Sequence, residues 1–268
     1  MNAFYPIQPP AIRREPSDSG YQYREYRPSR RWESYVACYW TLRCRASEIG
    51  VTHRIIPDCC VDIIFDLHAS TDAAGAFAVG IMTAYEALRL NAETSLFGIR
   101  FYSDRARSLF GYPVSELKGD RAQLTDLWGS KAQFLIEEIR EASGVAEIIA
   151  IIESIFSKIE SGRASSSDPL LRSSMACLFA ARGAIDVRTL AERCGYSERT
   201  VRRVFKAELG VSPKQMMDLI RFQSILMDRH RGSRGSLADL AFKYGYYDQS
   251  HFNHTFKRLY GLAPGQVF

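Results

Sequence analysis

The C-terminal part of the chain contains an internal repeat. Residues 190–196 (LAERCGY) recur as residues 240–246 (LAFKYGY), and residues 204–206 (VFK) recur as residues 255–257 (TFK). The offset is 50 residues for the first pair and 51 for the second, so one residue is inserted near Tyr247. Because a repeat defines the unit from which a fold is built, the sequence predicts two copies of one small structural unit.

Each copy has the signals of two short helices joined by a tight turn. In the first copy, Asp186 and Ser197 are suited to cap the starts of two helices, and Gly195 can end the first helix in a left-handed conformation. The second copy has the same signals at Ser236, Asp248 and Gly245. The spacing predicts a helix-turn-helix unit in each copy, and residues 213–230 between them read as one long helix that would fix their separation.

The second helix of each unit has two different faces. In the first copy, Val201, Val204 and Phe205 form an apolar side, and the opposite side is basic, with Arg199, Arg202, Arg203 and Lys206. In the second copy the apolar side consists of Phe252, Phe256, Leu259 and Tyr260, whereas Ser250, His251, His254 and Arg258 face away from it. Such faces could bind phosphates and base edges, although an isolated basic helix is about as often only a solvated surface. Duplication favours DNA as the binding partner. Two recognition helices about 34 Å apart, one helical turn of DNA, fit successive major grooves.

These residues resemble the DNA-binding domain of the AraC/XylS family of bacterial transcription regulators. Residues 241–264 (AFKYGYYDQSHFNHTFKRLYGLAP) are similar to the family signature, and residues 195–213 (GYSERTVRRVFKAELGVSP) to its weaker counterpart. The resemblance implies that Arg199, Arg202 and Arg203 face bases from the first recognition helix. It implies the same role in the second for Gln249, Ser250, His251, Asn253 and His254. Lys206 and Lys257 complete the expected DNA-binding set.

The charge distribution agrees with a polyanionic partner for the C-terminal part. Residues 165–268 contain 16 Lys and Arg against 9 Asp and Glu, and the remainder of the chain contains 19 against 21. The overall net charge of +5 therefore comes from the part that carries the repeat. Positive charge placed in this way attracts phosphates and releases counterions.

Residues before about 103 have the pattern of short strands. Residues 1–20, with four prolines, are predicted to be an extended arm, and the predicted strands cover residues 36–42, 53–56, 61–67, 77–81, 85–90 and 96–102. Stretches such as Cys38–Leu42 (CYWTL), Val61–Phe65 (VDIIF) and Phe97–Phe101 (FGIRF) resemble the N-terminal domain of an uncharacterised branch of the same family. The resemblance implies a cupin-like β-barrel. The predicted fold class is α+β: this barrel with trailing helices, followed by an all-α double helix-turn-helix domain.

The pattern turns helical after Ser103. Helices are predicted at residues 117–128, 131–141 and 145–159, and the last has a wide apolar face that could cover its own domain or form a dimer contact. Residues 161–168 (SGRASSSD) are small and polar, as in a linker. The predicted organisation is a sensing or dimerisation domain at 1–160, a linker at 161–168 and a DNA-binding domain at 169–268.

The first domain contains candidate ligand-binding groups but no catalytic motif. Its aromatic residues could pack as core or line a cavity, and Trp40, Arg54, Glu86 and Arg100 are the residues expected to contact a small molecule. Five His and Asp residues could hold a metal: His53, Asp58, Asp62, Asp66 and His68. Strand alternation places Asp62, Asp66 and His68 on one strand face, so the charged residues could instead form its solvent-exposed side. No metal, cofactor or enzymatic activity is predicted.

The sequence therefore predicts a sequence-specific DNA-binding transcription regulator controlled by a small molecule. No apolar run approaches the ~20 residues that cross a bilayer, so a cytoplasmic location and six reduced cysteines are expected. Expected partners are double-stranded DNA, an effector, a second copy of the chain and, for an activator, RNA polymerase. The alternatives are a metal-binding or enzymatic cupin-like domain recruited to DNA, and an architectural DNA-binding protein without an effector.

Overall fold

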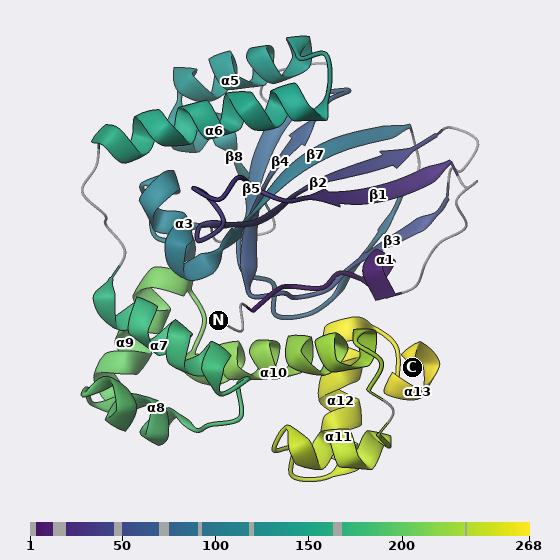
Figure 1. Cartoon of the computed structure of the whole chain (residues 1–268), viewed down its shortest axis with the longest axis vertical. Helices are drawn as coiled ribbons and strands as arrows, with labels where there is room; N and C mark the ends of the chain where they lie inside the picture. The colour runs from purple at the N-terminus through teal and green to yellow at the C-terminus, as the bar shows by residue number, and fades with distance from the viewer. Residues whose placement is uncertain are drawn as a thin grey trace.

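The computed structural model describes residues 4–12, 20–45, 50–69, 75–90, 93–117, 121–162, 168–233 and 235–268. Its N-terminal part consists of strands followed by helices, and its C-terminal part is helical (Figure 1). The predicted α+β class, with β structure first and a helical C-terminal domain, is confirmed.

The strands form two antiparallel sheets. The larger sheet has the order β1-β2-β7-β4-β5-β8, and the smaller one pairs β3 with β6. The bounds are β1 Tyr21–Tyr26, β2 Val36–Cys44, β3 Thr52–Ile55, β4 Cys60–Asp66, β5 Ala76–Val79, β6 Glu86–Arg89, β7 Thr94–Tyr102 and β8 Ala122–Gln123. The six predicted strands are present, and each of their bounds agrees within two residues. Strand β1 was not predicted, and the two-residue strand β8 lies inside the predicted helix 117–128, whose helical part is only α4, Leu124–Trp128.

Strand β4 shows how the alternation of the sequence positions the interior of the domain. Val61, Ile63 and Phe65 are buried, with exposed fractions of 1% or less. Asp62 and Asp66 point to the opposite face and are half-buried. The predicted alternation is therefore present, but its polar face is turned toward a cavity in the domain.

Two antiparallel helices cover the apolar face of the large sheet (Figure 1). They are α5, Ser130–Glu141, and α6, Val145–Gly162. Phe156 of α6 packs edge-on against Trp32 and Phe101, with ring centroids 5.4 and 5.6 Å away. The apolar face of α6 thus covers its own domain, which was one of the two expected roles. Two shorter helices follow β7: α3, Ser103–Phe110, and η2, Val114–Glu116.

The C-terminal part contains both predicted helix-turn-helix units. The first consists of α8, Val187–Cys194, and α9, Glu198–Leu209; the second consists of α11, Leu237–Lys243, and α12, Gln249–Tyr260. The long helix α10, Pro213–His230, joins them, and α13, Pro264–Val267, ends the domain. The predicted caps Asp186, Ser197, Ser236 and Asp248 each accept a hydrogen bond from a backbone N–H of the first helical turn.

Besides the four-residue helix α13, one further C-terminal helix was not predicted. Helix α7, Pro169–Ala180, begins at the N-cap Asp168 with a proline in the first turn, and it packs against α8 and α9. Helix α6 ends at Gly162. The predicted linker 161–168 therefore lies largely outside the described residues, since residues 163–167 are not described, and the domain boundaries stay a prediction.

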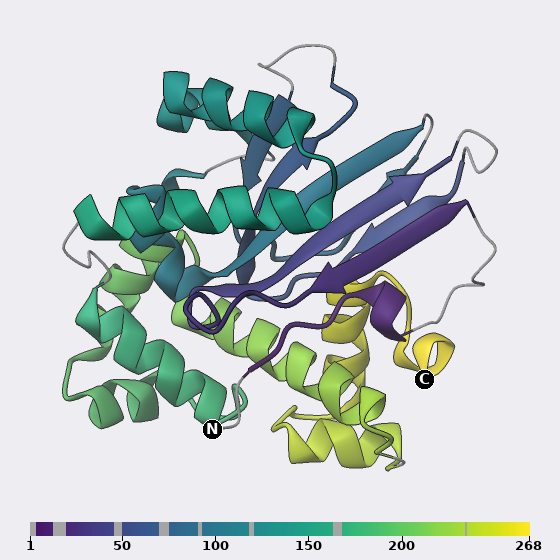
Figure 2. The same ribbon diagram turned by 45° about the horizontal axis from the view of Figure 1, so that its top comes forward.

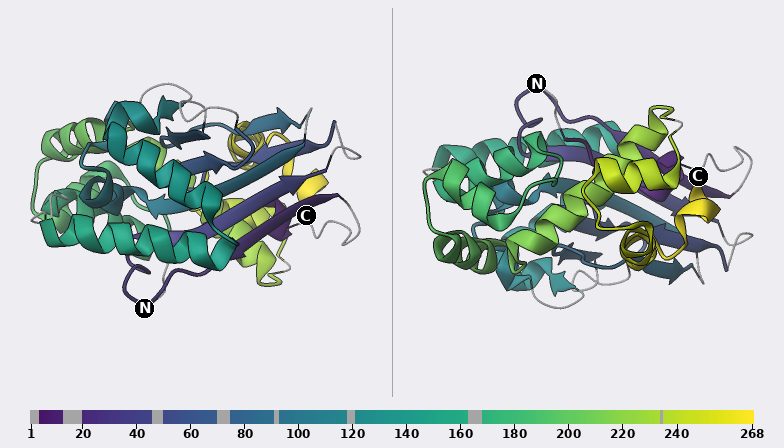
Figure 3. Two further views of the ribbon diagram at one scale, coloured as in Figure 1. Left: turned by 90° about the horizontal axis from the view of Figure 1, so that it is seen from above. Right: turned by 90° about the horizontal axis from the view of Figure 1, so that it is seen from below.

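The N-terminal segment lies between the two parts of the molecule rather than extending from it as an arm. Ile7 and Gln8 are buried, and residues Pro9–Ile12 form the short helix α1; residues 13–19 of the predicted arm are not described. Helix α10 crosses beneath the strands, with the N-terminal segment beside it (Figures 2 and 3). Among the described helices, none is both long and apolar enough to span a membrane.

Candidate DNA-facing helices and ligand cavity

Helix α9 presents four cationic side chains on a surface that its apolar face holds in place. Gly195, at φ 74°, ends α8 in the left-handed region, and Ser197 then caps α9 through the N–H of Thr200. Val201, Val204 and Phe205 are buried. The predicted residues Arg199, Arg202, Arg203 and Lys206 are all exposed.

These four cations differ in their existing partners. Arg202 forms an ion pair with Glu198 at 2.9 Å, and the Nζ of Lys206 donates to the carbonyl oxygen of Gly210 at 2.9 Å. No described residue forms an ion pair or a hydrogen bond with the side chain of Arg199 or Arg203. Arg199 and Arg203 are therefore the guanidinium groups of α9 best placed to bind an external anion.

Helix α12 presents hydrogen-bonding groups instead of arginines. Asp248 caps the helix by accepting a hydrogen bond from the N–H of His251 at 2.7 Å. The exposed residues are Gln249, Ser250, His251, His254 and Lys257, as predicted. Asn253 is half-buried, and its Oδ1 is buried without a hydrogen-bond partner among the described atoms. The exposed side chains of α12 therefore offer amide, hydroxyl, imidazole and ammonium groups to an external partner.

Exposed aromatic residues flank the helix-turn-helix surfaces, and sequence reasoning did not select them for binding. Tyr196 is 52% exposed, Phe242 86% and Tyr247 93%. Tyr247 is the inserted residue of the second copy. Its neighbour Tyr246 is buried and packs edge-on against His251 at 5.4 Å, so it orients the recognition helix. The only sequence signal for Tyr247 was its place in the repeat, where the first copy has no counterpart.

Both recognition helices point their C-terminal ends at the N-terminal domain (Figure 1). At the end of α9, Glu208 pairs with Arg107, and the carbonyl oxygen of Ala207 accepts from Ser115. At the end of α12, Arg258 donates to the carbonyl oxygen of Thr83 at 2.7 Å, and Arg54 donates to that of Tyr260 at 2.8 Å. The first turns of both helices, with Arg199 in α9 and Gln249, Ser250 and His251 in α12, lie at the opposite ends, away from these contacts.

A cavity of roughly 150 Å³ lies between the two sheets of the N-terminal domain. The large sheet contributes the residues of its polar face, among them Tyr23, Trp40, Asp62, Asp66 and Arg100. The small sheet faces them with His53, Ile55, Glu86 and Leu88. Such an enclosed space with a few polar groups is typical of a small-molecule site.

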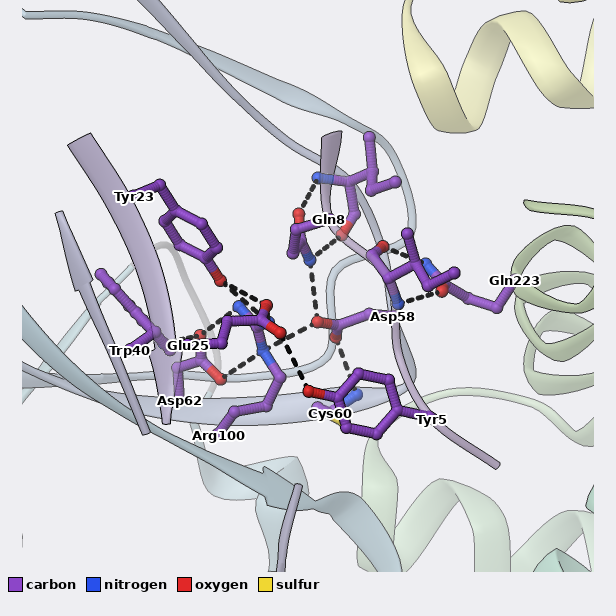
Figure 4. Close-up of polar contacts among 12 residues, drawn as sticks. Tyr5, Gln8, Tyr23, Glu25, Trp40, Asp58, Cys60, Asp62, Arg100 and Gln223 are labelled. Carbon is purple, nitrogen blue, oxygen red and sulfur yellow. Dashed lines mark hydrogen bonds and ion pairs between the residues drawn. The ribbon is translucent and has the colours of Figure 1, made fainter. Parts of the chain in front are cut away.

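Arg100 is the centre of a buried ionic network in this cavity (Figure 4). Its Nε lies 2.9 Å from Asp58 Oδ2, and its Nη2 lies 3.1 Å from Asp62 Oδ2. Its third donor group, Nη1, lies 3.6 Å from the carboxylate of Glu25. Trp40 Nε1 also donates to Asp62 at 3.1 Å. The guanidinium of Arg100 is therefore paired with three carboxylates, those of Asp58, Asp62 and Glu25.

Burial changes the protonation of several groups around the cavity. Desolvation raises the pKa of Asp62 to about 6, although the charge of Arg100 acts in the opposite direction. Desolvation also lowers the pKa of His53 to about 4, and the Arg100 cation lowers it further. His53 is thus neutral at pH 7, with its Nδ1 2.6 Å from the hydroxyl of Tyr21.

The network continues from the cavity to the DNA-binding part through the N-terminal segment (Figure 4). Gln8 Nε2 donates to Asp58 Oδ2 at 2.8 Å. The neighbouring Ile7 exchanges two hydrogen bonds with the side chain of Gln223 on α10, at 2.8 and 3.2 Å. Gln223 is buried, and its side-chain amide joins three backbone groups of the N-terminal domain: the N–H and carbonyl oxygen of Ile7 and the carbonyl oxygen of Pro57.

The predicted ligand residues do not all reach the cavity. Trp40, Glu86 and Arg100 line it, but Arg54 does not. The guanidinium of Arg54 lies over the rings of Tyr85 and Tyr260, 5.2 and 5.9 Å from their centroids, at the contact between the domains. Sequence reasoning did not select Tyr23 for the cavity, because β1 was not recognised as a strand.

The His and Asp residues considered for a metal are used in other contacts. Asp58 and Asp62 bind Arg100, Asp66 accepts a hydrogen bond from the N–H of His68, and His68 itself is exposed. In the described part of the chain, no three His, Cys, Asp or Glu residues are grouped so that they could hold a metal ion. None of the six cysteines forms a disulfide, and the four of the N-terminal domain are buried.

Comparison with known proteins agrees with the two helix-turn-helix units. A family model described as a helix-turn-helix domain matches residues 190–268. The same region is similar to the HTH-type transcriptional activator RhaS of Escherichia coli O139:H28, with 31% identity over 80 residues, and to that of Escherichia fergusonii, with 30% identity over 86 residues. The C-terminal domain is therefore similar to the DNA-binding domain of transcription regulators of the AraC/XylS type. The matches cover 29% and 31% of this chain, which spans only 28% and 30% of these activators.

The N-terminal domain of the chain matches a different model. Residues 24–123 match a domain of unknown function (DUF6597). Among solved structures, ToxT of Vibrio cholerae is similar over 92% of this chain and 96% of its own, with 15% identity and a TM-score of 0.41. A transcriptional regulator with an AraC-type DNA-binding domain from Chromobacterium violaceum covers 39% of this chain and 93% of its own, with 20% identity and a TM-score of 0.36.

Proposed function

We propose that this chain is a sequence-specific DNA-binding transcription regulator, in which α9 and α12 read DNA and a small molecule in the N-terminal cavity controls them. The observation that carries the proposal is the pair of exposed recognition faces, one basic and one rich in amide, hydroxyl and imidazole groups. Helix α10, with 18 residues, is about 27 Å long and holds the two units apart. We expect the two recognition helices to contact successive major grooves on one face of a duplex, about 34 Å apart.

The DNA site should be asymmetric, because the two units display different chemistry. Arg199 and Arg203 suit phosphates and the O6 and N7 atoms of guanine, whereas Gln249 and Asn253 suit adenine. Predicted contacts also include Arg202, Lys206, Ser250, His251, His254 and Lys257. RNA polymerase is a further partner if the chain activates transcription, as the name of its RhaS relatives describes for them. A chromosomal target would place the protein in the cytoplasm.

The segment between β5 and β6 could transmit the state of the cavity to α12. Gly80 and Met82 of this segment line the cavity. Three residues further, Tyr85 donates its N–H to the carbonyl oxygen of Arg258, whose side chain donates to Thr83. A ligand that moves this segment would change the contact with the end of α12 and thus the freedom of the recognition helix. A homodimer contact through the half-buried isoleucines of α6 is a second route for control.

The proposal is tested by selecting binding sites for the full chain from random DNA duplexes and footprinting the enriched site. We expect one asymmetric sequence with two protected segments about one helical turn, ~10 base pairs, apart. Binding without any enriched sequence would instead favour an architectural DNA-binding protein. A catalysed reaction in the cavity, with DNA binding serving only for recruitment, is the alternative from another class, and stoichiometric metal in the purified protein would support it.

A further inference from the structure

We propose that the cavity binds a small organic cation, an amine or quaternary ammonium attached to one apolar ring. This inference rests on the proposed effector function of the cavity and names the chemical class of the effector. Two independent features carry it: the charge that lines the cavity, and the aromatic surface that Trp40 forms in it.

The charge of the cavity lining is negative. Four carboxylates line it, from Asp58, Asp62, Asp66 and Glu86, against the two guanidinium groups of Arg100 and Arg121. The remaining ionisable group of basic type, His53, is neutral at pH 7 because its pKa is lowered to about 4. Binding a cation would reduce this excess of negative charge, whereas binding an anion would increase it.

The surplus charge belongs to two carboxylates that have no cationic partner. Within the described chain, no ion pair joins Asp66 or Glu86 to Lys, Arg or His. Asp66 lies on β4 of the large sheet, and Glu86 lies on β6 of the small sheet, which faces it across the cavity. Glu86 is exposed as well as lining the cavity, so it stands at the mouth. A cation entering the cavity would meet Glu86 there.

A glycine leaves the space that the aromatic side chain of Trp40 occupies in the cavity wall. A Cβ added to Gly98 would lie only 2.0 Å from the indole of Trp40, so the ring lies directly over the backbone of β7. Tyr23 stacks beside it, with ring centroids 6.0 Å apart. Tryptophan is the aromatic side chain that best attracts a cation over its face, and a partly desolvated site strengthens that attraction.

Size and the state of Arg100 restrict the ligand further. A cavity of roughly 150 Å³ has the volume of engineered cavities that hold one benzene ring. An anionic ligand inside the cavity would meet the guanidinium of Arg100, which already binds Asp58, Asp62 and Glu25. To bind Arg100, an anion would have to displace a buried carboxylate. The other guanidinium of the lining, that of Arg121, is exposed and lies over the ring of Phe77, 4.6 Å from its centroid.

Three probes of equal size and different charge test the proposal: benzylamine, benzyl alcohol and benzoate. Their affinities for the full chain are measured by isothermal titration calorimetry without DNA. We expect benzylamine to bind at least tenfold more tightly than benzyl alcohol, and benzoate to bind most weakly. Equal affinities for benzylamine and benzyl alcohol, tighter binding of benzoate, or no binding of benzylamine at millimolar concentration would each overturn the proposal.

A matched pair of variants locates the binding site. Glu86→Gln should weaken benzylamine binding about fivefold or more and leave the affinity for benzyl alcohol unchanged, because only the charge at the mouth is removed. The control is Glu138→Gln, an exposed carboxylate on α5 outside the cavity, which should change neither affinity. An equal loss for both variants would mean that surface charge alone attracts the probe, and would also overturn the proposal. Because the DNA experiment needs no ligand, and the titration needs no DNA, each proposal can fail without the other.

Discussion

Gln223 of α10 donates a hydrogen bond from its side-chain amide to the carbonyl oxygen of Pro57, 2.8 Å away in the N-terminal domain. The same amide bonds both backbone groups of Ile7. One buried side chain therefore joins the DNA-binding part to the loop before β4 and to the N-terminal segment.

Replacing Gln223 with Leu should weaken this junction. The change keeps a similar volume but leaves one buried N–H and two buried carbonyl oxygens without their partner, at a cost of about 1–3 kcal/mol. Urea unfolding of the full chain measures the loss, with Lys214→Ala at an exposed position of the same helix as control. If both variants unfold alike, the contact between the domains does not contribute to stability.

Arg203→Ala should weaken DNA binding by about 1–3 kcal/mol and relax specificity at particular base pairs, if this residue contacts a base edge. Binding to the selected site and to single-base variants of it is compared at several salt concentrations. A uniform loss on every sequence, with a shallower dependence on salt, would assign Arg203 to phosphate. Arg24→Ala removes an exposed arginine from β1 and should have no effect.

Phe256→Ala should destabilise the second helix-turn-helix unit by about 3–5 kcal/mol. The ring is 1% exposed and contacts the rings of Phe222, Phe252, Tyr260 and Phe268. Phe242→Ala removes a ring that is 86% exposed and should change stability by less than ~0.5 kcal/mol. Denaturant unfolding distinguishes the two, and similar losses would contradict the burial of Phe256.

Gly98→Ala should destabilise the N-terminal domain by about 1–3 kcal/mol, because the new methyl group would overlap the indole of Trp40. The ring would have to leave its place and lose its hydrogen bond to Asp62. Unfolding curves together with tryptophan fluorescence detect both effects. Gly144→Ala has open space around the added methyl group and serves as the control. An unchanged fluorescence spectrum in Gly98→Ala would show that Trp40 does not lie over β7.

His53 should make the protein less stable in acid. Its pKa is lowered from 6.5 to about 4 in the folded state, so the unfolded chain binds more protons between these two values. Stability contributed by neutral His53 is therefore present above pH 6.5 and is lost as the pH falls to 4. Compared with His53→Gln, the wild-type protein should lose an additional ~1–3 kcal/mol between pH 7 and pH 4. A difference that is constant with pH would contradict the buried, neutral imidazole.

Local signals in the sequence were sufficient to predict the two C-terminal helix-turn-helix units. Caps such as Ser197 and Asp248, and an apolar stripe such as Val201, Val204 and Phe205, act within one or two helical turns. The repeat then predicted that two such units are present, because the same helix signals occur at corresponding positions of both copies. Helix α7 was missed although Asp168 and Pro169 mark its start, since it lies outside the repeat.

The N-terminal domain could be predicted only in part. Alternation in β4 separated Asp62 and Asp66 from Val61, Ile63 and Phe65, but alternation does not say which face meets solvent. That depends on whether another sheet covers the polar side, as β3 and β6 do here. Arg54 illustrates the same limit, because its place at the domain contact depends on Tyr260, 206 residues further along the chain.

The sequence by itself determined the repeated helix-turn-helix units, most of their exposed residues and six of the eight described strands of the first domain, because short-range hydrogen bonds and the periodicity of apolar residues specify them. Only the tertiary structure decided that the polar strand face encloses a cavity, that carboxylates occupy Arg100, and that Gln223 connects the two domains. These features depend on contacts between residues far apart in the chain, and no local pattern of residues encodes which partners will meet.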